Sequence, residues 1–131
     1  MKKIMMFVLV ISVLAIAPIA ASAASVEGSV QGFTCVTQGI TCPVGMEDPM
    51  AAAEKLFVVL SADADGKYYF VPNIDRAAMA RHINERVKVT GKVSEKYNSI
   101  QAKKLEAWKN GIWVTVWTQK NQDRVLRDIG P

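Results

Sequence analysis

An Asn110-Gly111 dipeptide between two runs of β-branched and aromatic residues is the feature that most restricts the fold of this chain. Both residues suit a two-residue type I′ turn, because both central positions of that turn need positive φ. We therefore expect residues 100–108 and 112–117 to form an antiparallel hairpin.

This turn also determines which residues share a face of the hairpin, because side chains alternate along a strand. With Lys109 opposite Ile112, one face is apolar and belongs to the core: Leu105, Ala107, Val114 and Val116. The other face carries a candidate partner patch: Lys104, Trp108, Trp113 and Trp117. Aromatic residues beside a cation are typical of partner sites, although packing under the C-terminal tail would explain them equally well.

Residues 87–94, VKVTGKVS, alternate between apolar and polar residues and predict the half-buried strand that precedes this hairpin. Gly91 stands in the apolar row, which is expected where a strand bends or another backbone approaches closely. Between residues 100 and 105 the alternation slips by one position. A β-bulge near Lys103 and Lys104 would restore it, and we predict one there.

Residues 1–23 have the three parts of a secretory signal: two lysines, an apolar run to about residue 17, and small residues at 21–23. The run is shorter than the roughly 20 residues that a membrane-spanning helix needs. We expect cleavage before Ala24, a periplasmic or secreted protein, and no membrane span afterwards.

Cleavage would leave 108 residues, enough for one domain, which we place at 24–119. Residues 120–131 would form a C-terminal tail, with apolar residues at the spacing of a short helix. The cleaved chain has 14 basic and 12 acidic residues, so its net charge is only about +2. This balance disfavours nucleic acid as a partner.

Cys35 and Cys42 are the only cysteines of the chain. In an oxidising compartment they predict a disulfide, and closing this eight-residue loop would stabilise the fold by about 2.5 kcal/mol. Their spacing matches no zinc or haem motif and the only histidine, His82, is distant, so we expect no metal and no cofactor. A redox-active pair remains an alternative, although no C-x-x-C motif is present.

The remaining segments predict two short helices and three more strands. Asp48-Pro49 can begin a helix, and Asn73 or Asp75 can cap a second one that ends near Ile83. Two apolar runs flank the turn at Asp65-Gly66 and should pair with each other. The strands are expected at these ranges: 26–35, 56–61 and 67–71.

A helix between the third and fourth strands of a small barrel is the arrangement of the OB-fold. The sequence VKVTGKVSEKYNSIQAKKLE, residues 87–106, also resembles the end of the small periplasmic bacterial OB-fold proteins. There a V-x-V-x-G-x-V strand precedes a charged, aromatic and Asn-Ser turn. We therefore expect a mostly β, five- to six-stranded OB-fold-like barrel with a disulfide-stapled first loop. The residues that match the motif are Gly91, Val93, Tyr97 and Asn98.

The resemblance implies an exported protein without a catalytic centre, associated with ligand binding or envelope stress. OB-folds bind across their second and third strands, between the first-to-second and fourth-to-fifth loops. On this chain the candidate ligand-binding residues are Tyr68, Phe70, Lys96, Tyr97 and Asn98. The aromatic residues among them could instead fill the core.

We thus expect a monomeric, non-enzymatic binding module of the cell envelope for a protein, glycan or small molecule. No acid, base or nucleophile is paired in the sequence in a way that would indicate an enzyme. The alternative is an envelope stress or redox protein that uses Cys35 and Cys42, with a bound metal as a further option.

Overall fold

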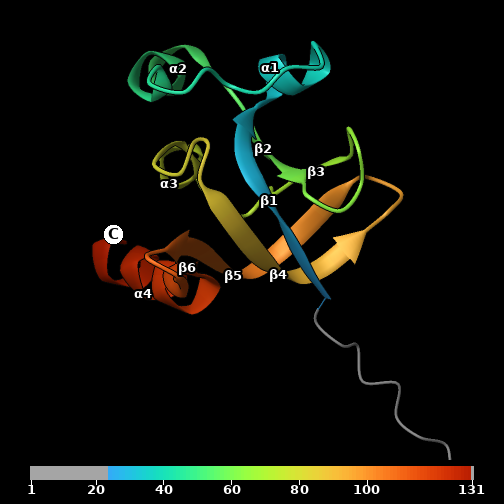
Figure 1. Cartoon of the computed structure of the whole chain (residues 1–131). Coiled ribbons are helices and arrows are strands. Elements are labelled where there is room, and N and C mark those ends of the chain that lie inside the picture. The colour runs from blue at the N-terminus through green and yellow to red at the C-terminus, as the bar shows by residue number, and fades with distance from the viewer. Residues whose placement is uncertain (1–23, 131) are drawn as a thin grey trace, which may run out of the picture.

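Six strands form one antiparallel sheet in the computed structural model, which describes residues 24–130 (Figure 1). Four helices accompany the strands. The elements follow one another in this order: β1 (Ala24–Gly32), α1 (Phe33–Thr37), α2 (Glu47–Ala53), β2 (Phe57–Ser61), β3 (Tyr68–Phe70), α3 (Arg76–Ala80), β4 (Arg86–Ser94), β5 (Ser99–Lys109), β6 (Ile112–Thr118) and α4 (Gln119–Ile129). No helix of the described segment is long and apolar enough to cross a membrane.

The sheet comes round on itself as a ring. Its strand order is β3-β2-β1-β4-β5-β6, and a parallel pairing of Phe70 with Ser99 brings β3 back to β5. The helix α3 lies between β3 and β4 in the chain. The predicted mostly β class, the six strands and the helix between the third and fourth strands are therefore confirmed. The predicted signal, residues 1–23, lies outside the described residues.

The antiparallel pairing of β4 with β5 contains the predicted bulge. Thr90 pairs with Lys104 and Gly91 pairs with Ala102, which leaves Lys103 without a partner in β4. A Cβ atom on Gly91 would lie 2.1 Å from the Gln101 carbonyl oxygen, so only glycine permits this approach. The bulge returns Ile100 and Ala102 to the inner side of the ring, where both are buried.

The inner side of the ring holds the hydrophobic core, to which all strands of the ring contribute. Val30, Val59, Val87, Ile100 and Leu105 are completely excluded from solvent. Met79 of α3 and Tyr69 of β3 are also buried in this cluster. The sequence left the direction of the aromatic residues of β3 open, and the structure places Tyr69 inward and its two neighbours outward.

Asn73 has a different role from the helix cap that the sequence suggested. The helix α3 begins later, at Arg76, and its N-cap residue is Asp75. The Asn73 side chain instead accepts from the Ala102 backbone N–H at 2.8 Å and donates to the Ala102 carbonyl at 2.6 Å. It thus pairs with β5 as another strand would, next to the bulge.

The first loop differs most from the sequence prediction. The predicted strand 26–35 ends at Gly32, and α1 follows directly. The carboxylate of Glu54 accepts from both the backbone N–H and the hydroxyl of Thr34, which stabilises the first turn of α1. This contact spans 20 residues, so no local sequence signal could predict it. The second helix, α2, begins at Glu47, one residue before the predicted Asp48 cap.

Replacing Gly91 by alanine should destabilise the protein by about 1–3 kcal/mol, because the new methyl group meets β5 backbone that cannot move aside cheaply. Urea unfolding of Gly91→Ala measures this loss. Lys92→Ala, on the exposed neighbouring position, is the control and should stay within about 0.5 kcal/mol of the parent protein. Equal stability of the two variants would contradict the close approach of β4 and β5.

Candidate functional site

Three half-buried aromatic rings meet on the outer side of β3. The ring centroids of Phe33 and Tyr68 are 5.9 Å apart, those of Phe33 and Phe70 are 5.5 Å apart, and those of Tyr68 and Phe70 are 5.7 Å apart. We call these three residues the aromatic cluster. Phe33 comes from the first turn of α1 and was not singled out by the sequence, because only the fold brings α1 against β3.

The predicted turn residues lie beside this cluster. The backbone N–H of Phe70 donates to the Asn98 carbonyl at 2.7 Å, and Asn98 has a positive φ of 47°. Asparagine tolerates this left-handed conformation better than most residues. Tyr97 is 66% exposed, and the Lys96 ammonium lies 5.2 Å from the centre of its ring. The two groups of candidate ligand-binding residues, which are separated by 25 residues of sequence, therefore meet at the backbone bond between Phe70 and Asn98.

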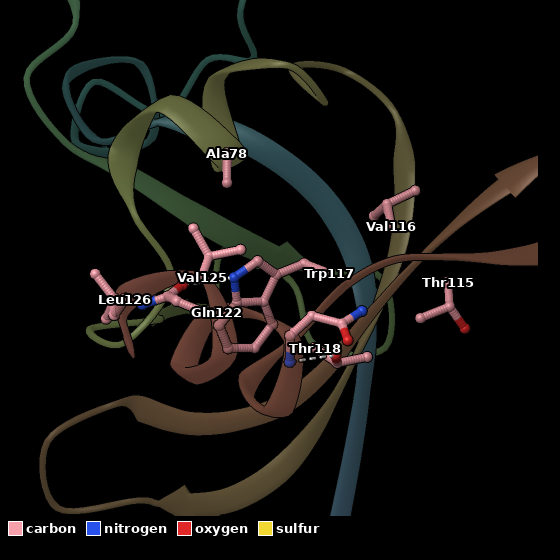
Figure 2. Close-up of a pocket in the computed structure, with 9 residues that line it drawn as sticks. Ala78, Thr115, Val116, Trp117, Thr118, Gln122, Val125 and Leu126 are labelled. Atoms are coloured by element: carbon pink, nitrogen blue, oxygen red, sulfur yellow. Dashed lines mark hydrogen bonds between the residues drawn. The ribbon is translucent and has the colours of Figure 1, made fainter. Parts of the chain in front are cut away.

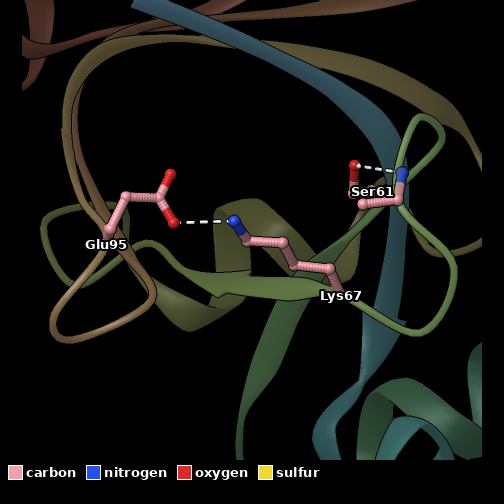
Figure 3. Close-up of polar contacts among 4 residues, drawn as sticks. Ser61, Lys67 and Glu95 are labelled. Atoms are coloured by element: carbon pink, nitrogen blue, oxygen red, sulfur yellow. Dashed lines mark hydrogen bonds and ion pairs between the residues drawn. The ribbon is translucent and has the colours of Figure 1, made fainter.

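An ion pair ties this turn to the hairpin of β2 and β3. The Lys67 Nζ lies 2.6 Å from Glu95 Oε2 (Figure 3). This hydrogen bond to Glu95 raises the pKa of Lys67, and Tyr69 acts in the same direction. Both charged groups are accessible to water, so we assign the pair a positioning role rather than a large contribution to stability.

A cavity of about 530 Å³ lies between the first loop and the turn that joins β2 to β3. One wall is formed by the loop between the cysteines, including Val36 and Ile40, and the opposite wall by the turn between β2 and β3. Leu60 lines the cavity and is the cross-strand partner of Tyr68. We use the name candidate surface for the aromatic cluster, residues 96–98 and this cavity.

The predicted tryptophan patch is only partly present. Trp108 and Trp113 pair edge to face, with ring centroids 5.1 Å apart. Trp117 lies elsewhere, because Glu106 pairs with Thr115 but Leu105 pairs with Trp117, so that Val116 is an extra residue in β6. The slip turns Trp117 to the inner side, where it packs against the core. Lys104 pairs with Thr118, and the prediction that Trp117 shares the outer face with Lys104 is therefore wrong.

Two cations complete the remaining patch, and the sequence analysis missed both. The Arg86 guanidinium lies 5.1 Å from the Trp108 ring centre and 5.3 Å from that of Trp113. The Lys88 ammonium lies 4.4 Å from the Trp113 ring centre. Arg86 and Lys88 share one face of β4, a signal that alternation alone could have given. Lys104 instead lies 3.5 Å from Glu106.

The predicted disulfide is not bonded in this structure. The sulfur atoms of Cys35 and Cys42 are 3.3 Å apart and both cysteines are buried free thiols. A disulfide needs a separation of about 2.05 Å, so the two sulfurs would have to approach by more than 1 Å. The Cys42 sulfur meanwhile accepts from the Gly32 N–H at 3.1 Å, and this contact helps to hold it in place.

Buried polar groups surround the two thiols. Gln31 is 2% exposed and its side-chain oxygen accepts from the Cys42 backbone N–H at 2.6 Å. Its amide nitrogen donates to Asn84, which in turn donates to Glu47 and thereby lowers the pKa of that carboxyl group. Burial raises the pKa of the Cys35 thiol to about 11, and its contact with Cys42 adds to this effect.

Neither metal-site geometry nor similarity assigns a function. Among residues 24–130, no three histidine, cysteine, aspartate or glutamate residues lie close enough together to hold a metal ion. The chain matches no protein-family model, no curated protein and no solved structure. Its site is therefore interpreted from its own geometry.

The raised pKa of Cys35 makes its alkylation strongly dependent on pH. In the reduced native protein, iodoacetamide should modify Cys35 much more slowly than in the urea-unfolded protein at pH 8, because only the thiolate reacts. The rate should rise about tenfold per pH unit towards the thiol pKa. Peptide mapping by mass spectrometry follows Cys35 separately from Cys42. A rate that is already maximal near pH 8 would contradict the raised pKa.

Proposed function

We propose that this protein is an exported, non-enzymatic binding module of the cell envelope that takes its ligand on the candidate surface. The single observation that carries the proposal is that the aromatic cluster lies next to residues 96–98. These aromatic rings remain half-exposed on the outer side of the ring, whereas Tyr69 already fills the core from the same strand.

The connectivity supports an OB-fold-like barrel as the framework. The circular order β1-β2-β3-β5-β4, with α3 between β3 and β4, matches the five strands and the helix position of that fold. OB-folds use the face of strands 2 and 3 and the loops that flank it. The candidate surface occupies the corresponding place, between the first loop and the turn from β4 to β5.

The chemistry of the candidate surface fits a ligand with both flat apolar parts and hydrogen-bonding groups. The rings offer apolar faces, while Lys96 and the Asp63 and Asp65 carboxylates at the cavity offer charges of both signs. A glycan, a peptide or a small envelope molecule of mixed polarity has this character. The volume of the cavity lies within the range of small-molecule sites.

Ligand binding can be tested with three defined probes: soluble peptidoglycan fragments, neutral oligosaccharides, and a mixture of unstructured peptides. We expect one probe to shift the amide NMR signals of residues 33, 68–70 and 96–98. Tyr97→Ala should weaken its affinity at least about fivefold, while stability changes by less than about 0.5 kcal/mol because the side chain is largely exposed.

Tyr97→Phe keeps the ring and is the matched control, with an expected affinity within about twofold of the parent protein. Trp113→Ala tests the second patch. A ligand that shifts Trp108 and Trp113 and is lost only in Trp113→Ala would place binding on that patch and contradict the candidate surface. Absence of shifts with all three probes would contradict the proposal for these ligand classes.

The two thiols support a second candidate function, a redox protein. Oxidation of Cys35 and Cys42 would form one S–S bond, and the two electrons and two protons would pass to an external disulfide that is reduced to two thiols. Their separation of 3.3 Å requires only a local movement for this step. If the protein is a binding module, as proposed above, the same S–S bond forms after export and only stabilises the first loop.

A glutathione redox titration of the folded protein distinguishes these two roles. For a buried structural staple we expect a reduction potential below about −300 mV. A potential near the range of oxidoreductases, about −120 to −270 mV, would favour the redox function. Cys35→Ser/Cys42→Ser is the control that should show no titration.

A further inference from the structure

The bulged region of β4 and β5 borders a second cavity, of about 730 Å³. The loop before α3 and the first turns of α4 form its other walls. It shares no lining residue with the cavity of the candidate surface or with residues 96–98. Its volume lies within the range of small-molecule sites. We call it the bulge cavity.

Hydrogen bonds hold the walls of the bulge cavity in place. Asn73 is bonded to both backbone groups of Ala102, and its amide nitrogen also donates to the Gln119 side-chain oxygen at 2.7 Å. The Gln119 amide nitrogen in turn donates to Asp123 at 2.6 Å. These bonds join the loop before α3, β5 and α4 in one chain of contacts. The cavity is therefore organised before any ligand binds, which lowers the cost of binding.

Two lysines line the bulge cavity from neighbouring strands, Lys92 from β4 and Lys103 from β5. Lys103 is the extra residue of the bulge, and bulges often redirect a side chain towards a functional site. Within residues 24–130 neither lysine has an ion-pair partner, whereas Lys67, Lys104 and Lys109 each contact a glutamate. A bound anion would also relieve the repulsion between the two like charges.

One carboxylate, that of Asp75, is the only acidic group among the residues that line the bulge cavity. Its side chain makes no capping hydrogen bond to α3. Two ammonium groups and one carboxylate leave the cavity with a single excess positive charge. The field in the cavity therefore favours a ligand with one negative charge.

Side-chain amides add hydrogen-bonding groups for the uncharged part of a ligand. Gln101 is exposed at the cavity and pairs with Lys92 across the two strands. Gln122 lines the cavity from α4 and accepts from the Trp117 indole N–H at 2.7 Å, so its amide nitrogen is available as a donor. Figure 2 shows Gln122 and Trp117 at the neighbouring, smaller cavity of about 350 Å³, which both residues also line.

We propose that the bulge cavity binds a small sugar acid, with the ligand carboxylate on Lys92 and Lys103. The ligand hydroxyl groups meet the side chains of Asp75, Gln101 and Gln122. Bonds between ammonium groups and a carboxylate are stronger than those between neutral groups, so the acid group supplies most of the affinity. A free sugar acid and the terminal uronate of an acidic glycan share this chemistry. This site is separate from the candidate surface and gives the protein a second ligand.

NMR titration of the purified protein at constant ionic strength tests the proposal with three probes: glucuronate, glucose and inorganic phosphate. We expect glucuronate to shift the amide signals of residues 92, 101, 103 and 122, with a dissociation constant of about 1 mM or lower. Glucose has the same ring without the carboxylate and should bind at least about 10-fold more weakly. Phosphate lacks the sugar hydroxyl groups and should also bind at least about 10-fold more weakly.

Lys92→Gln/Lys103→Gln should weaken glucuronate binding about 10-fold or more. Both lysines are exposed, so the stability of this variant should stay within about 1 kcal/mol of the parent protein. Lys55→Gln/Lys109→Gln removes the same charge away from the cavity and is the matched control, with an expected affinity within about twofold of the parent protein. Equal weakening in the two double variants would reduce the effect to net charge and overturn the proposal.

The other outcomes are equally decisive. No shift of these signals up to about 50 mM glucuronate would overturn the site. Phosphate that binds there as tightly as glucuronate would overturn the assignment to a sugar. Glucuronate shifts confined to residues 33, 68–70 and 96–98 would overturn this site while supporting the candidate surface, so either proposal can fail alone. A uronate disaccharide that binds more tightly at the same residues would support the site and identify an acidic glycan as the source, and equal affinity would support it with the free sugar acid.

Discussion

The pairing of β4 with β5 is the constraint on which the other elements depend. Along its other side, β5 pairs first with β3 at Ser99 and later with β6. One strand can serve three neighbours only if it bends between them. The unpaired Lys103 and the missing side chain at Gly91 permit this bend, and Asn73 fills the gap between β3 and β6 with two hydrogen bonds to Ala102.

The first loop depends on buried polar contacts as well as on hydrophobic packing of Cys35 and Cys42 in the core. Glu54 holds the start of α1, and Gln31 holds the backbone of Cys42. A buried carboxylate or amide is costly without partners. In residues 24–130 every fully buried side-chain nitrogen or oxygen atom has a hydrogen-bond partner. These contacts hold the two ends of the first loop, one at the start of α1 and the other at Cys42.

The candidate surface was predictable only in parts. Tyr68, Phe70 and residues 96–98 followed from the expected strand order, and the structure places them side by side. Phe33 could not be predicted, because the sequence continued β1 as a strand through Cys35. The register expected from the Asn110-Gly111 turn contained no extra residue in β6. Trp117 was therefore expected on the wrong face of the hairpin. A single inserted residue reverses every later side chain of a strand, and alternation alone cannot detect it when both faces are apolar.

By itself, the sequence determined the local features of this protein. The Asn110-Gly111 turn, the bulge near Lys103 and the close approach at Gly91 follow from backbone conformations that few residues allow. Only the tertiary structure decided which outward groups meet, namely the aromatic cluster with residues 96–98, and Arg86 with two tryptophans. It also left the sulfur atoms close but not bonded. Such contacts depend on segments far apart in the chain, and their distances are set by packing, which no local pattern encodes.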